Sequence, residues 1–146
     1  MDLTHYTSDQ LISFFDTKDQ KQALRHLISM VKGAGKIKNE ADFLEKVEAR
    51  EAITSTGIGM GVALPHAKDK ELENFFICIG VSEHGIEWHS IDGNPVKLIF
   101  LIGGPDYKQN EYLNILSSLT TMIKDEEKRK KMLTVNSPVS MMKLLN

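Results

Sequence analysis

Two almost uninterrupted apolar runs lie in the middle of the chain and predict buried β-strands. The first spans Asn74–Ser82 and the second spans Val96–Ile102. A strand that is covered on both faces lacks polar alternation, so both runs are typical of the interior of a sheet. Ile91-Asp92-Gly93-Asn94 predicts a tight turn between them, and Gly103-Gly104-Pro105 ends the second run. Before that turn, His84-Gly85 predicts another turn, followed by a short edge segment.

Segments with helical periodicity precede these strands. The first begins at Asp19 and stops at Gly33 and Gly35. Its expected inward positions are Ala23, Leu24, Leu27, Ile28 and Val31. Asn39 is a suitable cap for a second helix. Its expected inward positions are Phe43, Leu44 and Val47. The earlier segment Leu11–Phe15 is compatible with either a strand or a helical turn, because five residues define no period.

Three helices are predicted after the second strand. The expected inward positions of the first are Leu113, Ile115, Leu116, Leu119 and Ile123. Asp125 can cap the second, whose acidic start and basic Lys128–Lys131 suit the helix dipole. Ser137-Pro138 opens a short third helix that ends near Leu145. Helices and strands therefore alternate, which predicts an α/β sandwich. We expect one domain over residues 1–146, with a mixed central sheet of about five strands and helices on both faces.

Composition excludes several classes of function. The chain has 146 residues, a net charge of −2 and one cysteine, Cys78. The charge argues against nucleic-acid binding, and one cysteine permits neither an intramolecular disulfide nor a cysteine-based zinc site. We expect Cys78 to be a buried, inert thiol. No apolar run reaches the ~18 residues of a membrane span, and no signal peptide is recognisable. These features predict a cytoplasmic protein without membrane insertion.

The segment Arg50–Lys68 holds the candidate chemistry. It combines the hydroxyls of Ser55 and Thr56, three alternating glycines and Leu64-Pro65-His66. The proline stiffens the backbone that presents the His66 ring. The glycines allow backbone N–H groups to face an anion, while the two hydroxyls and the Arg50 guanidinium are donors for phosphate. A neutral imidazole has a lone pair that can attack phosphorus, so the pattern predicts phosphoryl transfer through His66.

Nucleotide and metal sites are weaker interpretations of the same residues. The glycine spacing matches neither Gly-x-x-x-x-Gly-Lys-Ser/Thr nor Gly-x-Gly-x-x-Gly, so we expect no ATP or NAD cofactor. His66, His84 and His89 could converge on a metal ion with a carboxylate. Nothing in their spacing requires this, and we expect no metal.

The motif resembles a known family. Arg50-Glu51, followed by Ser55-Thr56-Gly57-Ile58-Gly59-x-Gly61-Val62-Ala63-Leu64-Pro65-His66, is similar to the active-site motif of type 2 enzyme IIA domains. These belong to the fructose/mannitol and nitrogen-regulatory branch of the bacterial sugar phosphotransferase system. The resemblance extends through Ile91-Asp92-Gly93-x-Pro95-Val96 and covers most of the chain. It implies that His66 receives a phosphoryl group from the histidine-containing phosphocarrier protein and passes it to an enzyme IIB partner, while Arg50 stabilises phosphate.

The chain departs from the family pattern at three positions. Tyr112 stands where a second histidine is common, and its hydroxyl could bond the phosphate or the His66 ring, or its ring could fill the core. Met60 replaces a usually polar residue, and Ala67 replaces a common glycine. These departures bear on the transfer rate and on the choice of partner.

Three functions are compatible with the sequence. The first is a phosphocarrier in sugar uptake, and the second is a regulatory protein whose phosphorylation controls its binding to other proteins. The third is a degenerate domain that is not phosphorylated, which Tyr112 suggests. The resemblance leaves the sugar and the oligomeric state open. We expect a shallow apolar rim around His66 rather than a tight small-molecule pocket.

Overall fold

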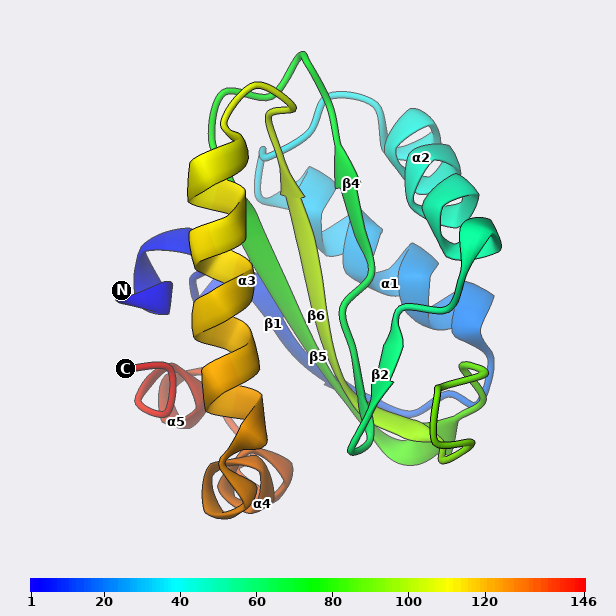
Figure 1. Ribbon diagram of the computed structural model, residues 1–146, viewed down its shortest axis with the longest axis vertical. Coiled ribbons are helices and arrows are strands. Elements are labelled where there is room, and N and C mark those ends of the chain that lie inside the picture. The colour runs from blue at the N-terminus through cyan, green and yellow to red at the C-terminus, as the bar shows by residue number, and fades with distance from the viewer.

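The sheet is built around β5 (Phe76–Ile86) and β6 (Val96–Gly104), which contain the two predicted buried strands. The computed structural model describes residues 1–146. β5 and β6 run antiparallel, with Ile79 opposite Phe100. Six strands form one mixed sheet in the order β1-β5-β6-β3-β2, and β4 also pairs with β6 (Figure 1). The short strands are β1 (Ile12–Phe15), β2 (Gly57–Gly59), β3 (Val62–Ala63) and β4 (His66–Lys68).

Helices α1 (Gln20–Gly33) and α2 (Glu40–Ile53) cover one face of the sheet. Each begins where the sequence predicts, because the Asp19 side chain accepts the Lys21 N–H and Asn39 accepts the Asp42 N–H. All five predicted inward positions of α1 are buried. In α2, Phe43 and Val47 are buried and Leu44 is partly buried.

Helices α3 (Gln109–Lys124), α4 (Glu126–Thr134) and α5 (Pro138–Met142) cover the opposite face, together with the 3₁₀ turn Leu3–Tyr6. A second 3₁₀ turn, Asp9–Leu11, leads into β1. The apolar side chains of these helices form a core cluster with the strands beneath them. The predicted α/β architecture with helices on both faces is therefore confirmed. None of the helices combines the length and the apolar character that a membrane crossing requires.

Several predicted element boundaries were wrong. His84-Gly85 is not a turn but part of β5, which continues past a register shift between Val81 and Ile86. The second strand does not stop at Ile102: Gly103 and Gly104 still pair with neighbouring strands, and β6 ends only at Gly104, before Pro105. Leu113 points outward and is exposed, while Tyr112 takes the inward position.

Cys78 is buried on the α1 side of the sheet, as predicted. Burial raises the pKa of its thiol to about 12. The thiolate that would react is therefore suppressed at neutral pH, and Cys78 serves as a small apolar residue in the core.

We predict that Gly103→Ala destabilises the protein by about 1–3 kcal/mol, because the added methyl overpacks the core. Its Cβ would lie 2.2 Å from Cζ of Phe76 and 2.8 Å from Cζ of Phe43, both of which are buried. Urea unfolding measures the change. Gly33→Ala is the matched control: no atom lies within 4 Å of its Cβ, so its free energy of unfolding should stay equal or rise slightly. Equal stability of the two variants would contradict this account of the packing.

Candidate functional site

His66 is the first residue of β4, on the edge of β6. β3 and β4 both run parallel to β6 and are separated only by Leu64-Pro65. The backbone is held on each side of this interruption. The Leu64 N–H donates to the Thr56 carbonyl at 3.0 Å, and the Ile102 N–H donates to the Pro65 carbonyl at 3.0 Å. The imidazole therefore projects from a backbone that is fixed at consecutive residues.

The geometry of the His66 ring distinguishes its two nitrogens. Nδ1 lies 3.0 Å from the carbonyl oxygen of Leu64. Because a carbonyl only accepts hydrogen bonds, Nδ1 carries the proton of the neutral ring and Nε2 carries the free lone pair. The ring is half-buried, and this burial is the main reason that the pKa of His66 is lowered from 6.5. The charges of Arg50 and Lys68 lower it further.

Arg50 lies in the last turn of α2, close enough to influence both rings of the site. Its guanidinium donates to the Thr54 carbonyl at 2.9 Å. Its positive charge lowers the pKa of His66 and also opposes the rise in the pKa of Tyr112 that burial causes. The structure therefore brings Arg50, His66 and Tyr112 together, although they come from three different elements.

The hydroxyls of Ser55 and Thr56 are engaged within the protein. Ser55 Oγ donates to the Trp88 carbonyl at 2.6 Å and accepts the Gly57 N–H at 3.0 Å. Thr56 Oγ1 donates to Glu51 at 2.5 Å and accepts the indole N–H of Trp88 at 3.1 Å. Thr56 is only 4% exposed. This differs from the expectation of two free donors: in this conformation both hydroxyls hold the loop that precedes His66.

The glycine loop also differs from the predicted anion-binding arrangement. Gly59, Met60 and Gly61 all have left-handed backbones, with φ of 92°, 59° and 73°. Gly59 ends β2, and Met60 and Gly61 form the turn to β3, which explains the glycines on either side of Met60. The Met60 N–H donates to the Asp92 carboxylate at 3.1 Å. Since the Gly57 N–H is bonded as well, neither of these two amides is free for an anion.

Glu51 is a residue of the site to which the sequence assigned no role. Its carboxylate accepts both the N–H of Thr56, at 2.7 Å, and the hydroxyl of the same residue. This pair of hydrogen bonds ties the end of α2 to the loop. The only sequence signal was its place beside Arg50, and a carboxylate next to an arginine at a helix end can equally face solvent.

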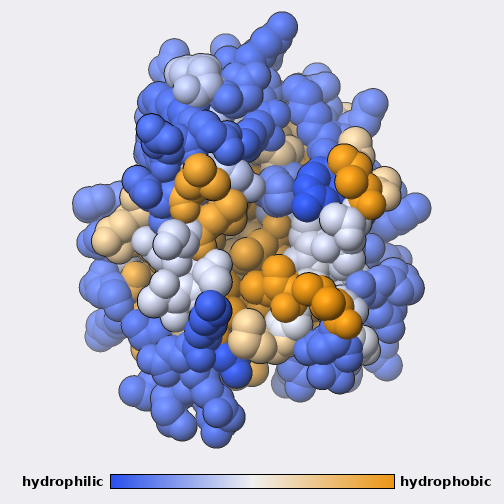
Figure 2. Space-filling view, in the orientation of Figure 1, coloured by the Kyte–Doolittle hydropathy of each residue, from blue (hydrophilic) through white to orange (hydrophobic).

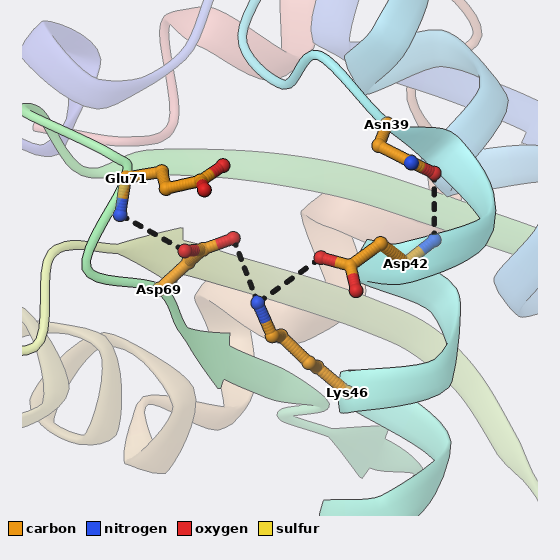
Figure 3. A network of polar contacts seen from close by, with 5 residues as sticks. All are labelled: Asn39, Asp42, Lys46, Asp69 and Glu71. Carbon is orange, nitrogen blue, oxygen red and sulfur yellow. Dashed lines mark hydrogen bonds and ion pairs between the residues drawn. The ribbon is translucent and has the colours of Figure 1, made fainter.

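Helix α2 is also connected to the end of β4, through Lys46 and Asp69 (Figure 3). Lys46 Nζ lies 3.1 Å from Asp69 and 3.0 Å from Asp42. Asp69 directly follows β4, and its carboxylate also accepts the Glu71 N–H. Lys46 is 41% exposed, so we assign the ion pair only about 1 kcal/mol or less. The ion pair helps to position α2 relative to β4, one helical turn before Arg50.

Tyr112 packs in the first turn of α3 and fills the core through its ring. The ring is buried, lies 5.8 Å from the His66 ring and stacks on Phe75 at 6.1 Å between centroids. Burial raises the pKa of its hydroxyl, which therefore stays neutral near pH 7. The buried ring fits the core-filling interpretation, and the hydroxyl makes no hydrogen bond to the His66 ring, although the two rings are in contact.

The other histidines do not join His66. His84 contacts Asp16 and His89 lies beside Glu87. No group of three or more histidine, cysteine, aspartate or glutamate side chains is arranged to hold a metal ion.

His66 does not line the main cavities of the molecule. Figure 2 shows apolar surface gathered in the middle of the face on which α3 and the β2–β4 edge lie. The exposed large apolar residues from elements flanking the site are Ile53, Met60 and Leu113. This surface suits contact with a protein better than enclosure of a small molecule.

Comparison with known proteins identifies the family. The family model described as "Phosphoenolpyruvate-dependent sugar phosphotransferase system, EIIA 2" matches residues 5–146. The chain belongs to this EIIA type 2 family. Members of the family are phosphotransfer proteins.

Relatives of this EIIA chain include proteins with different roles. It is 33% identical over 131 residues to the fructose-specific EIIABC component of Bacillus subtilis, covering 90% of this chain but only 21% of that protein. It is 30% identical to the fructose-specific EIIA component of Haloferax volcanii, covering 93% and 89%. It is 29% identical to a nitrogen regulatory protein of Bradyrhizobium diazoefficiens, covering 85% and 80%.

Solved EIIA structures share the fold. The nitrogen regulatory protein IIA-Ntr from Neisseria meningitidis superposes with a TM-score of 0.92 at 24% identity, covering 97% of each chain. The mannitol IIA of Escherichia coli, solved in complex with phosphorylated IIB, superposes with a TM-score of 0.79 at 16% identity, covering 93% and 94%. The predicted family and fold are thereby confirmed.

We predict that His66 titrates below 6.5 in the folded protein, because burial and two nearby cations oppose its protonation. Since the folded-state pKa is depressed, stability is lost as the pH falls from the unfolded value of about 6.5 through the folded pKa. NMR titration of the His66 ring, assigned by its loss in His66→Ala, measures the value. The same protein unfolded in urea is the reference. A folded pKa at or above the unfolded value would contradict the proposed environment.

Proposed function

We propose that this chain, as a single EIIA domain over residues 1–146, is a phosphohistidine carrier. His66 accepts a phosphoryl group from the histidine-containing phosphocarrier protein and passes it to an enzyme IIB partner in fructose- or mannitol-like sugar uptake. The observation that carries this proposal is the imidazole itself: its Nδ1 is tied to the Leu64 carbonyl and its Nε2 is free. The motif match around His66 and the fructose-specific relatives support it.

The hydrogen bond to Leu64 suits both directions of transfer. The Nε2 lone pair attacks phosphorus as the P–N bond of the donor breaks, and the donor nitrogen keeps that electron pair. Nδ1 retains its proton, so the His66 ring becomes cationic as the new bond forms. The Leu64 carbonyl, 3.0 Å away, stabilises this charge. The cationic ring is also a good leaving group for the next transfer.

Arg50 is the proposed phosphate-binding residue. In the unphosphorylated protein its guanidinium is held by a single hydrogen bond to an exposed backbone carbonyl, that of Thr54. Exchange of this bond for phosphoryl oxygens costs little, because water can solvate the released carbonyl. Ser55 and Thr56 support the reaction by holding the loop, and their hydroxyls would face phosphate only after breaking these hydrogen bonds.

A second candidate function is regulation, in which phosphorylation of His66 controls binding to other proteins. The similarity to the nitrogen regulatory protein of Bradyrhizobium diazoefficiens favours it. The two candidates share the first step and differ in the acceptor. Incubation of the phosphorylated protein with fructose- and mannitol-type IIB domains separates them: rapid transfer to IIB supports uptake, and absence of transfer supports regulation.

We predict that His66→Ala abolishes labelling by phosphoenolpyruvate, enzyme I and the phosphocarrier protein. The wild type should gain one acid-labile phosphoryl group in intact mass spectrometry. His89→Ala is the matched control, because that side chain is 84% exposed and lies outside the site, so it should label like the wild type. Labelling of His66→Ala, or no labelling of the wild type, would overturn the proposal and in the second case would favour a degenerate domain.

We predict that Arg50→Ala slows phosphoryl transfer about 100-fold, a typical loss when one donor to a developing charge is removed. The thermal stability should change little, because Arg50 is only partly buried and makes one hydrogen bond to backbone. Arg25→Ala, on the exposed side of α1, is the control for loss of positive charge. Quench-flow labelling and a melting curve are measured together. A large drop in melting temperature with unchanged transfer would make Arg50 a structural residue instead.

A further inference from the structure

Lys68 is a second cation on the strand that carries His66. The two residues are separated by one position of β4, whose Ala67 is buried on the opposite face, so their side chains project to the same side. Their Cα atoms are consequently about 7 Å apart. The charge of Lys68 is one of the two nearby cations that lower the pKa of His66, the other being Arg50.

The ammonium of Lys68 is held by the first turn of α3. Nζ lies 4.2 Å from the centroid of the Tyr112 ring, which is within the range of a cation–π contact. It also donates to the side-chain carbonyl of Gln109 at 2.5 Å. Gln109 and Tyr112 are three residues apart and therefore neighbours on one face of the helix. A long, flexible side chain is thus directed to one place on the surface.

Tyr112 in turn cannot move freely. Its ring is buried, stacks on Phe75 and contacts the His66 ring at 5.8 Å between centroids. The same ring therefore touches the proposed nucleophile and the ammonium of Lys68. Since its hydroxyl is not part of either contact, the ring is the part of Tyr112 that determines where the positive charge lies.

We propose that Lys68 is a second phosphate-binding cation of the site and that Tyr112 is the residue that positions it beside His66. This inference rests on the proposed phosphoryl transfer to His66. A phosphoryl group on Nε2 brings two negative charges, which Arg50 alone does not neutralise. Lys68 exchanges the Gln109 carbonyl for a phosphoryl oxygen, and this exchange costs little because Gln109 is exposed to water.

The test uses the full chain phosphorylated chemically with potassium phosphoramidate, so that no protein partner is involved. The pH dependence of the ³¹P resonance of phospho-His66 reports the second pKa of the phosphoryl group. In Lys68→Met this pKa should rise by about one unit, the lower end of the range for loss of a neighbouring opposite charge. Lys68→Arg should restore it. Lys70→Met is the matched control, because Lys70 is exposed beyond the end of β4.

Variants of Tyr112 test the positioning role. Tyr112→Leu removes the ring and should raise the phosphoryl pKa as Lys68→Met does, whereas the conservative Tyr112→Phe should restore the value. The double variant Lys68→Met, Tyr112→Leu should add nothing to Lys68→Met alone, because Tyr112 acts through Lys68. Additive shifts would overturn the positioning role.

The outcomes separate the inference from the function on which it rests. If wild type labels on His66 but Lys68→Met and Lys70→Met give the same phosphoryl pKa, the inference fails and the proposed function stands. If Lys68→Met is normal in this assay and slow only with the phosphocarrier protein, Lys68 binds the partner rather than phosphate, and the inference fails as well. If His66 of the wild type is phosphorylated neither by phosphoramidate nor by the phosphocarrier protein, both the inference and the proposed function fail.

Discussion

The hydrogen bonds along one edge of β6 are the constraint on which the rest of the site depends. They hold the segment 61–69 against β6. The Gly61 and Pro65 carbonyls accept hydrogen bonds from β6, and the Asp69 N–H donates one to it. Two short strands and a proline kink are therefore held as if they were one continuous strand. β6 lies in the centre of the sheet and is almost entirely buried. The backbone that carries His66 is therefore hydrogen-bonded to one of the most stable parts of the molecule.

The second requirement is that α2 keeps a fixed distance from that edge, since Arg50 belongs to the helix and His66 to the strand. Two polar contacts provide this. At the end of the helix Glu51 accepts a hydrogen bond from the Thr56 N–H, and about one turn earlier Lys46 donates to Asp69. The apolar contact between α2 and the sheet sets the separation, and these polar contacts set the register. Neither needs to be strong, because each only selects one position of elements that the core already packs.

The helices and the two central strands could be predicted because each repeats its pattern over many residues. Helix α1 is an example: Asp19 caps its start, and its five inward residues recur at helical spacing over residues 23–31. β3 and β4 could not be predicted, because two or three residues define no period. The same limit applies to strand ends. His84-Gly85 has the composition of a turn, yet pairing with neighbouring strands keeps it in β5.

For the site, the sequence by itself determined which groups are present: a histidine after a stiff Leu64-Pro65, an arginine at a helix end, and a cluster of hydroxyls and glycines. These are local properties of the chain. Only the tertiary structure decided which of those groups are free. In the folded chain Ser55 donates to Trp88 and Thr56 donates to Glu51. The Lys68 ammonium lies against the Tyr112 ring. A donor is available to a ligand only if no other part of the protein uses it, and its competitors come from residues far away in the sequence.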